Sequence, residues 1–189
     1  MVKILGTRKA IQDALAYAYT DDSSMAEYLD YLCRVDKTRK TGMEQHVMAI
    51  QYAKIRAAIN DQRTPIPQWI HFAYGPDLEC ANKGNQKRIL ALTLSLRLYS
   101  PPITVKRRDR IERLCECAAE DYRMGMFLGK TLPQVEYAKA MEIKPDQWQR
   151  DWEGMRQRVL DMIKGLDSDG IGHVSTVVRE IREAAEQTI

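Results

Sequence analysis

Apolar residues recur every three or four positions along most of the chain, which is the spacing of one face of an α-helix. The first stripe predicts a helix over residues 8–19. Two Ser/Thr-x-x-Glu capping boxes, at residues 24–27 and 41–44, predict the starts of two more helices. The second of these helices is long and ends near Asn60.

Prolines and glycines divide the middle of the chain. Pro65 or Pro67 begins a short predicted helix, and Gly75 with Pro76 ends it. A leucine-rich helix over residues 86–99 follows the break ECANKGN. Its apolar residues nearly surround it, so we expect this helix at the centre of the core.

The C-terminal half begins with the longest predicted helix, over residues 104–128, which Gly129 ends. After a short helix and a break, another helix begins at Pro145 and extends to about Leu166. The Gly-rich sequence DSDGIGHVS then predicts a turn before a last helix over residues 174–187. No segment has the pattern of a partner strand, and the predicted fold is an all-α multi-helix bundle.

The length of 189 residues suits one domain, or a small domain with an appended helical module. A hydrophobic share of 44% is enough to fill a core. We expect an N-terminal helical region over residues 1–80 and a basic helical region over residues 81–189, or else one continuous domain.

Positive charge is concentrated in one segment. Residues 83–113 hold nine Lys or Arg and two acidic residues, although the whole chain carries a net charge of only +3. A basic segment on a near-neutral chain is the pattern of a phosphate-binding surface; the alternative is a set of solvated helix faces. Five of these residues, early in the longest helix, are candidate DNA phosphate contacts: Lys106, Arg107, Arg108, Arg110 and Arg113.

The chain carries little that predicts catalysis or metal binding. Cys115 and Cys117 lie two apart on a predicted helix, so their side chains point about 200° apart and cannot chelate one metal. Asp167 and Asp169 match half of an EF-hand calcium loop, but Val178 stands where the bidentate Glu is needed. The three histidines lie on separate segments, and no hydrolase or nucleotide-binding motif is present. We therefore expect no catalytic residues, no metal, no cofactor and no enzymatic activity.

Three features of the sequence bear on the cellular compartment of the protein. The few cysteines are expected to be reduced and mostly buried, and no apolar run reaches the roughly 18 residues that span a bilayer. The N-terminus turns charged too early for a secretory signal. These features predict a cytoplasmic protein with no membrane partner.

The stretch LPQVEYAKAMEIKPDQWQRDW has the pattern of a helix-turn-helix. Ala138 is the small residue at which the two helices would cross closely. Tyr137, Met141 and Ile143 fall at the apolar positions of the motif, and Pro145 suits the first position of the second helix. The stretch therefore predicts either a DNA-reading module or an ordinary corner of a helical bundle.

The second helix of this stretch would present Lys144, Gln149 and Arg150 outward as DNA-contacting residues. Arg binds guanine and Gln binds adenine through paired hydrogen bonds, so both are suitable base readers. The stretch departs from the motif at Glu142, where the turn usually has glycine, and at Asp151, where an apolar residue is usual.

The same helix carries an apolar seam with a period of 3.5 residues, which is typical of packing in a core or against a second subunit. We expect the tryptophans of the seam to be packing anchors rather than base-stacking residues. The seam consists of Trp148, Trp152, Met155, Val159, Met162 and Leu166.

Residues 131–165 resemble the phage late-gene antiterminators called Q. The likeness lies in YAKAMEIKPDQWQRDWEGMRQRVLDMI: an apolar helix, a short turn, an early tryptophan in the next helix and a long amphipathic tail. The resemblance implies binding to a DNA element near a late promoter, followed by loading onto paused RNA polymerase. Only Lys144, Gln149 and Arg150 carry over as DNA-contacting positions. Some Q proteins carry paired-cysteine zinc motifs and this chain has none, which leaves either a zinc-free branch or a generic helix-turn-helix.

Two functions remain. The first is a DNA-binding transcription regulator, encoded by a phage or prophage, that acts as an antiterminator-like factor on double-stranded DNA and RNA polymerase. The second is a helical assembly or DNA-packaging protein that forms a homo-oligomer through the Trp/Met seam. A gel shift read alongside the oligomeric state would separate the two.

Overall fold

The computed structural model describes residues 6–18, 42–76, 80–99 and 103–187. All regular structure in these four ranges is helical, which confirms the all-α fold. The chain divides into two compact units, each assembled from separate stretches of sequence. The expected regions over residues 1–80 and 81–189 stay a prediction. The helix and capping box expected near residues 24–27, and the capping residue Thr41, lie outside the described residues.

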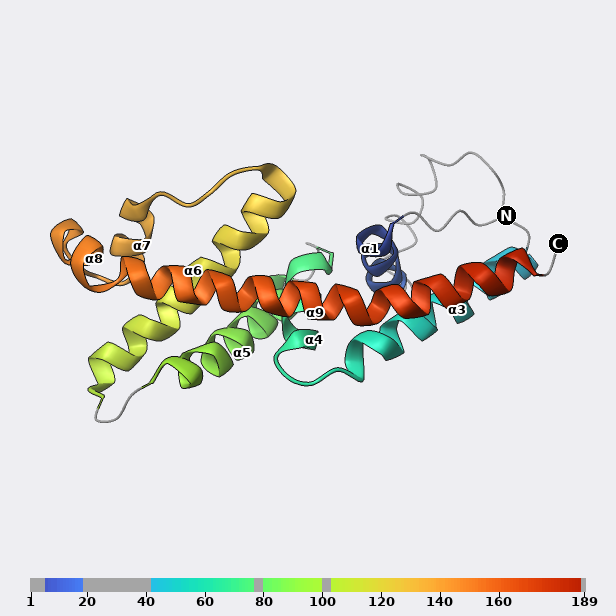
Figure 1. Cartoon of the computed structure of the whole chain (residues 1–189), viewed down its shortest axis with the longest axis horizontal. Coiled ribbons are helices and arrows are strands. Elements are labelled where there is room, and N and C mark those ends of the chain that lie inside the picture. Colours follow the sequence, from blue (N-terminus) through green and yellow to red (C-terminus); the bar gives the residue numbers. More distant parts are fainter. Residues whose placement is uncertain (1–5, 19–41, 77–79, 100–102, 188–189) are drawn as a thin grey trace. The chain divides into compact units, whose positions relative to one another are not determined.

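The first unit contains α1 (Thr7–Ala18) and α3 (Gly42–Asn60), which pack against each other (Figure 1). Both helices were predicted, and α3 ends at the expected residue. The rings of Tyr17 and Tyr52 lie 5.3 Å apart between them. The two helices bury mainly aliphatic side chains: Ala10, Ile11, Ala14, Leu15, Ile55, Ala58 and Ile59.

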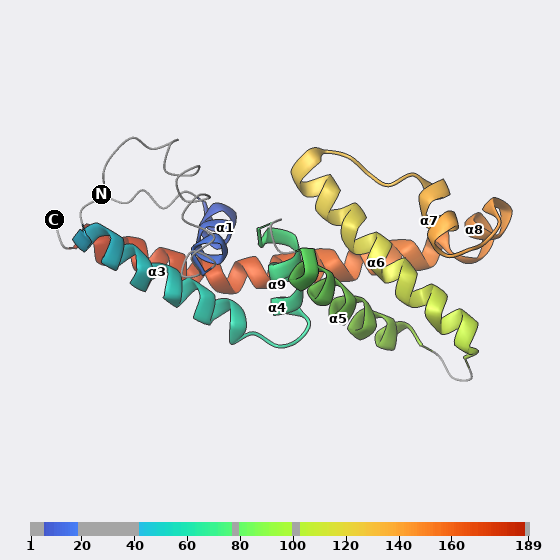
Figure 2. The same cartoon turned by 180° about the vertical axis from the view of Figure 1, so that it is seen from behind.

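The second unit is formed by residues 63–73 and 79–169 and contains all of the candidate DNA-contacting residues. Figure 2 shows α5 and α6 side by side in this unit. Its helices are most of α4 (Ile66–Tyr74), then α5 (Cys80–Leu98), α6 (Val105–Leu128), α7 (Gln134–Ala140), α8 (Pro145–Asp151) and the first part of α9 (Glu153–Glu186).

Helices α5 and α6 run antiparallel, because a later position along α5 contacts an earlier position along α6. Lys87 donates to Glu120 at 3.2 Å, and Tyr99, just after α5, donates to Glu112 at 2.8 Å. The sequence prediction for α5 was wrong in two respects. The helix begins at Cys80 rather than at residue 86. It also buries only one face, since Leu90, Ala91 and Leu94 are buried whereas Ile89, Leu92 and Leu96 are exposed.

The ends of α6 follow their local sequence. Thr104 is the N-cap, and its hydroxyl oxygen accepts the backbone N–H of Arg107 at 3.3 Å. Gly129 ends the helix in the left-handed conformation, with φ at +63°, which glycine adopts without steric cost. The predicted bounds of this helix are confirmed.

The predicted turn at DSDGIGHVS is wrong, because α9 is one helix from Glu153 to Glu186. Asp167 does not face solvent: its side chain is buried, and its Oδ1 accepts the indole N–H of Trp69 at 3.0 Å. Buried Val174 and Ile181 continue the apolar stripe of the helix beyond this point. Tertiary burial therefore overrides the turn-forming composition.

A second boundary also differs from the prediction. The helix expected from Pro145 to Leu166 is interrupted at Trp152, whose φ and ψ of −128° and −25° separate α8 from α9. No helix among the described residues is long and apolar enough to cross a bilayer.

Candidate nucleic-acid interface

Helices α7 and α8 are joined by the four residues from Met141 to Lys144. Glu142 adopts a left-handed conformation with φ at +54°, which is the conformation that glycine usually provides in such a turn. The backbone N–H of Ile143 donates to the carbonyl of Ala138 at 3.0 Å. Tyr137, Ala138 and Met141 are buried as the sequence predicts, whereas Ile143, also expected at an apolar position, is only half-buried. The two short helices and the tight turn between them are thus present.

Two arginines of α6 hold this turn. Arg110 donates from Nε to the carbonyl of Met141 at 3.1 Å and from Nη2 to the carbonyl of Glu142 at 3.0 Å. Arg113 donates from Nη1 to the carbonyl of Ala140 at 3.1 Å and to the Glu142 carboxylate at 2.6 Å. These bonds satisfy carbonyls that the end of α7 leaves unpaired. Two of the five candidate phosphate contacts therefore bind the protein's own turn.

The Glu142 carboxylate lies in a positive field. The hydrogen bond and charge of Arg113 lower the pKa of Glu142, and the charges of Arg110 and Lys106 lower it further. Lys106 therefore also lies within electrostatic range of the turn. The first turns of α6 and the α7–α8 turn are neighbours.

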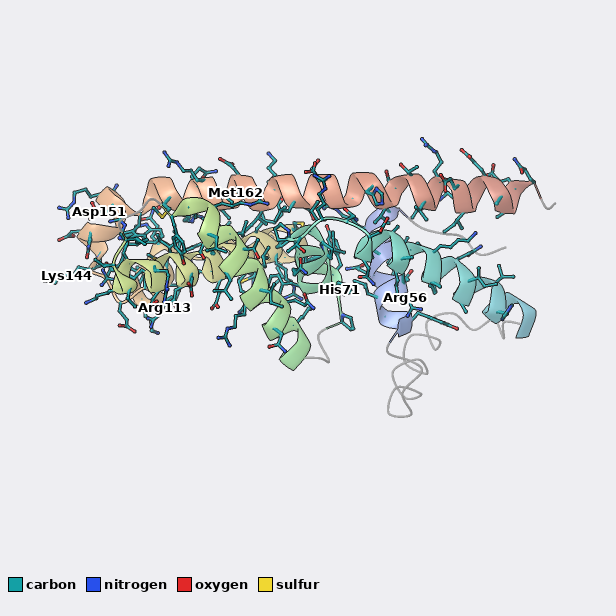
Figure 3. All side chains as sticks on the ribbon, turned by 90° about the horizontal axis from the view of Figure 1, so that it is seen from below. Arg56, His71, Arg113, Lys144, Asp151 and Met162 are labelled. Atoms are coloured by element: carbon teal, nitrogen blue, oxygen red, sulfur yellow. The ribbon has the colours of Figure 1, made fainter. Side chains whose placement is uncertain are left out.

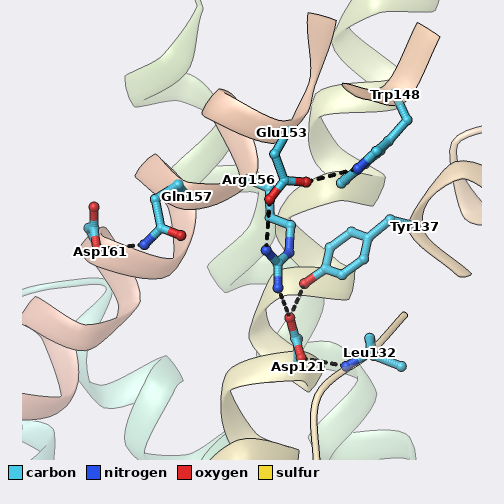
Figure 4. Close-up of polar contacts among 8 residues, drawn as sticks. All are labelled: Asp121, Leu132, Tyr137, Trp148, Glu153, Arg156, Gln157 and Asp161. Atoms are coloured by element: carbon cyan, nitrogen blue, oxygen red, sulfur yellow. Dashed lines mark hydrogen bonds and ion pairs between the residues drawn. The ribbon is translucent and has the colours of Figure 1, made fainter. Parts of the chain in front are cut away.

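Asp121 of α6 is the centre of a buried polar network (Figure 4). Its Oδ1 accepts the backbone N–H of Leu132 at 2.6 Å. Its Oδ2 accepts the hydroxyl of Tyr137 at 2.6 Å and Nη2 of Arg156 at 2.9 Å. One carboxylate on α6 therefore binds the segment before α7, α7 itself and α9.

The network continues from α9 to α8. Arg156 donates from Nη1 to Oε1 of Glu153 at 3.1 Å, and Oε2 of Glu153 accepts the indole N–H of Trp148 at 2.8 Å. The Arg156 guanidinium lies 5.1 Å from the centre of the Tyr137 ring, and this ring lies 5.1 Å from that of Trp148. The network fixes α7 and α8 to the two long helices from their buried side.

The other three basic candidates lie on the exposed N-terminal turns of α6. Lys106, Arg107 and Arg108 are all exposed. Arg107 places its guanidinium 5.6 Å from the centre of the Trp152 ring, at the junction of α8 and α9. Arg108 lies 3.8 Å from both Asp109 and Glu112, which is a loose arrangement for an ion pair.

The candidate base readers lie on the outer face of α8. Gln149 and Arg150 are exposed, whereas Trp148 on the opposite side is 1% exposed. Lys144 is exposed at the N-cap. Arg150 is bound to the neighbouring Asp151, whose pKa is lowered first by the hydrogen bond from Arg150 and also by the charge of Arg107.

The two sets of basic residues that the sequence predicts separately lie on adjacent elements. Figure 3 shows Arg113, Lys144 and Asp151 at the same end of the second unit. The contacts of Arg110 with the turn and of Arg107 with Trp152 join α6 to α8. An exposed surface with cations beside a polar helix face can bind phosphates and reach base edges. We call Lys106, Arg107, Arg108, Lys144, Gln149 and Arg150 the basic surface.

Sequence reasoning missed the buried network, although a signal for it exists. Asp121 follows Leu114 and Ala118 at helical spacing, and so it falls on the buried stripe of α6. Arg156, on α9, likewise lies at helical spacing between Trp152, just before that helix, and Val159, and both of these residues are buried. A charged residue on an apolar stripe indicates a buried polar partner.

Most of the Trp/Met seam packs inside the chain, whereas Met155 and Met162 are half-buried. Trp148, Trp152 and Val159 are at most 3% exposed, which confirms the tryptophans as packing anchors. Because these side chains are already covered, self-association through the seam is not supported. The described residues contain no group of three His, Cys, Asp or Glu side chains arranged to hold a metal.

The chain matches one family of known proteins. The family model for phage antitermination protein Q matches residues 32–189, well beyond the stretch from 131 to 165 in which the resemblance is visible by eye. The searches of curated proteins and of solved structures found no match. Since the family model covers most of the 189 residues, the chain belongs to the phage antitermination protein Q family.

Proposed function

We propose that this family member regulates phage transcription by binding double-stranded DNA through its basic surface and then acting on RNA polymerase as an antiterminator. The family match supports the antiterminator-like regulatory role. The observation that supports DNA binding is the junction between α6 and α8, where Arg110 holds the α7–α8 turn and Arg107 covers Trp152. From this arrangement we infer that the phosphate-binding and base-reading candidates contact the same duplex.

Within this surface the roles differ. We assign phosphate contacts to Lys106 and Arg108, because both are exposed and neither bonds the α7–α8 turn. We assign base contacts to Gln149 and Arg150, on the outer face of α8, with Lys144 at its start. Arg110 and Arg113 act on DNA only indirectly, by holding the turn. We propose no catalytic activity, in keeping with a regulatory family.

The test begins with a selection from randomised 30-bp duplexes, which yields a preferred duplex for the parent protein. Dissociation constants are then measured on the preferred and on random duplexes at several salt concentrations. Arg150→Ala should lower the ratio of preferred to random affinity by about tenfold to a hundredfold, because the contact to a base edge is lost. Lys106→Ala should weaken both duplexes equally and reduce the salt slope by about one unit.

Arg179→Ala is the matched control. Arg179 is exposed on α9, next to Glu183 at 3.9 Å, and its removal changes the net charge by the same amount. It should leave the affinity ratio and the salt slope unchanged. The DNA-binding proposal fails if the parent binds no duplex at low salt, or if Arg150→Ala leaves the ratio unchanged.

The polymerase step has its own assay. The preferred duplex is placed near a promoter, and readthrough of a downstream terminator by bacterial RNA polymerase is measured with and without the protein. We expect the parent to increase readthrough and Arg150→Ala to lose that increase. Equal readthrough with and without the parent protein would contradict the antiterminator role while leaving DNA binding intact.

A further inference from the structure

Arg150, the main candidate base reader, is not a free side chain. Its Nε donates to Oδ1 of Asp151 at 3.0 Å, and its Nη2 donates to Oδ2 at 3.3 Å. The guanidinium is thus held along one edge by both carboxylate oxygens. Arg150 is 75% exposed and Asp151 is 35% exposed, so the pair lies at the surface with the arginine outermost.

We propose that Asp151 is a specificity-determining positioning residue, which holds the Arg150 guanidinium so that its free edge faces a guanine. This inference rests on the proposed DNA-reading role of α8. A guanidinium has five N–H donors, and Asp151 takes one from Nε and one from Nη2. The two on Nη1 and the second on Nη2 remain, and two parallel donors are what guanine O6 and N7 accept in the major groove.

Asp151 is itself ionised. The hydrogen bond from Arg150 lowers the pKa of Asp151 most, and the charges of Arg150 and Arg107 lower it further. A carboxylate that stays ionised at neutral pH keeps both oxygens as acceptors for the arginine. The residue that departs from the helix-turn-helix pattern in the sequence thus has a role on the reading face.

Holding Arg150 affects selectivity more than affinity. A flexible arginine can bind phosphates on any duplex. A guanidinium held in one orientation gains binding energy only when a matching base lies opposite its free donors. Immobilising one long side chain before binding changes the affinity for the preferred site by about threefold to tenfold, and the affinity for random duplex much less. Loss of the Asp151 carboxylate should therefore lower the ratio of preferred to random affinity by about that factor.

The test compares Asp151→Asn with Asp161→Asn. Asp161 is exposed on α9 and also accepts a side-chain hydrogen bond, from Gln157 at 3.1 Å. Both substitutions remove one negative charge, so both should raise the affinity for random duplex similarly. Only Asp151→Asn should lower the ratio of preferred to random affinity. Tryptophan fluorescence should show both variants folded.

Base substitutions in the preferred duplex provide the decisive readout. Arg150→Ala should abolish the preference at one base pair, and Asp151→Asn should weaken the preference at that same base pair. In the Arg150→Ala background, Asp151→Asn should change the ratio no further, because the residue that it positions is absent.

The outcomes separate this inference from the proposed function. A parent protein without duplex preference, or an Arg150→Ala variant with an unchanged ratio, contradicts the reading role of α8. If Arg150→Ala lowers the ratio and Asp151→Asn does not, the positioning role alone is wrong. An increase in the ratio for Asp151→Asn would also overturn it, since the carboxylate would then compete with the base for Arg150.

Discussion

Replacing Asp121 with alanine tests whether the buried network holds α7 and α8 on the long helices. The carboxylate is 3% exposed and accepts three hydrogen bonds, from Leu132, Tyr137 and Arg156. The substitution leaves the Arg156 charge, on a side chain only 17% exposed, without its buried partner. Breaking a buried pair from one side costs about 3–5 kcal/mol. We expect the free energy of unfolding of the second unit to fall by about that amount.

The tryptophans provide a specific assay. The three tryptophans of the chain, Trp69, Trp148 and Trp152, are all buried in the second unit. Their fluorescence during urea denaturation therefore reports the unfolding of that unit. Asp161→Ala is the control, because its exposed side chain accepts one hydrogen bond from Gln157. A surface change of this kind should shift the unfolding free energy by about 0.5 kcal/mol or less.

A double substitution tests whether Asp121 and Arg156 stabilise the fold as a pair. Arg156→Met alone should be strongly destabilising, because it removes the cation beside a buried carboxylate. In the Asp121→Ala background it should cost at least about 1 kcal/mol less, since directly paired residues do not add. Additive effects of the two substitutions, or an Asp121→Ala variant as stable as Asp161→Ala, would show that this pair does not hold the helices.

Burial and the bond to Asp121 raise the pKa of Tyr137 in the folded protein, so the unfolded chain loses the phenolic proton first above pH ~10. Between pH 10 and 12 the parent should therefore lose stability faster than Tyr137→Phe, by about 1.4 kcal/mol per pH unit in urea titrations. Burial raises the pKa of Cys115 to about 12, and iodoacetamide at pH 8 should label it far more slowly in the native than in the unfolded protein, as peptide mass spectrometry would show. Trp148→Ala should lower the unfolding free energy by about 3–5 kcal/mol in a circular-dichroism melt, because the side chain is 1% exposed.

The features that the sequence predicts well are local ones. Helix α6 begins after Thr104 and ends at Gly129 as expected, because a capping hydroxyl and a left-handed glycine act within one turn of the chain. The burial of Trp148 and Trp152 follows from their spacing on the apolar seam. Such signals depend on neighbouring residues alone.

The errors occur where distant residues decide. The sequence DSDGIGHVS has the composition of a turn, yet Asp167 is buried against Trp69, which is 98 positions away. The leucines of α5 suggest a helix surrounded by core, but no partner covers Leu92 or Leu96 among the described residues. Local propensity decides neither result. Packing between elements keeps residues 167–175 helical and determines which face of α5 is buried.

The candidate site shows the same division. Position and residue type identify Arg150 and Gln149 as outward-facing residues of α8, and the structure agrees that both are exposed. The same reasoning groups Arg110 and Arg113 with Lys106, since all belong to one basic segment. Only the fold separates them, by bringing the carbonyls of residues 140–142 to the two arginines.

Glu142 combines an unfavourable backbone conformation with a side-chain contact to α6. Its left-handed φ of +54° is unfavourable for any residue with a side chain, and glycine would adopt it without steric cost. A glycine would keep the carbonyl that accepts Arg110 but would lose the carboxylate that accepts Arg113 at 2.6 Å. Glu142 in place of glycine therefore makes the left-handed backbone conformation less favourable, but its carboxylate gives the turn a second attachment to α6. Because that attachment holds the turn against α6, the outer face of α8 and the basic residues of α6 lie on neighbouring elements.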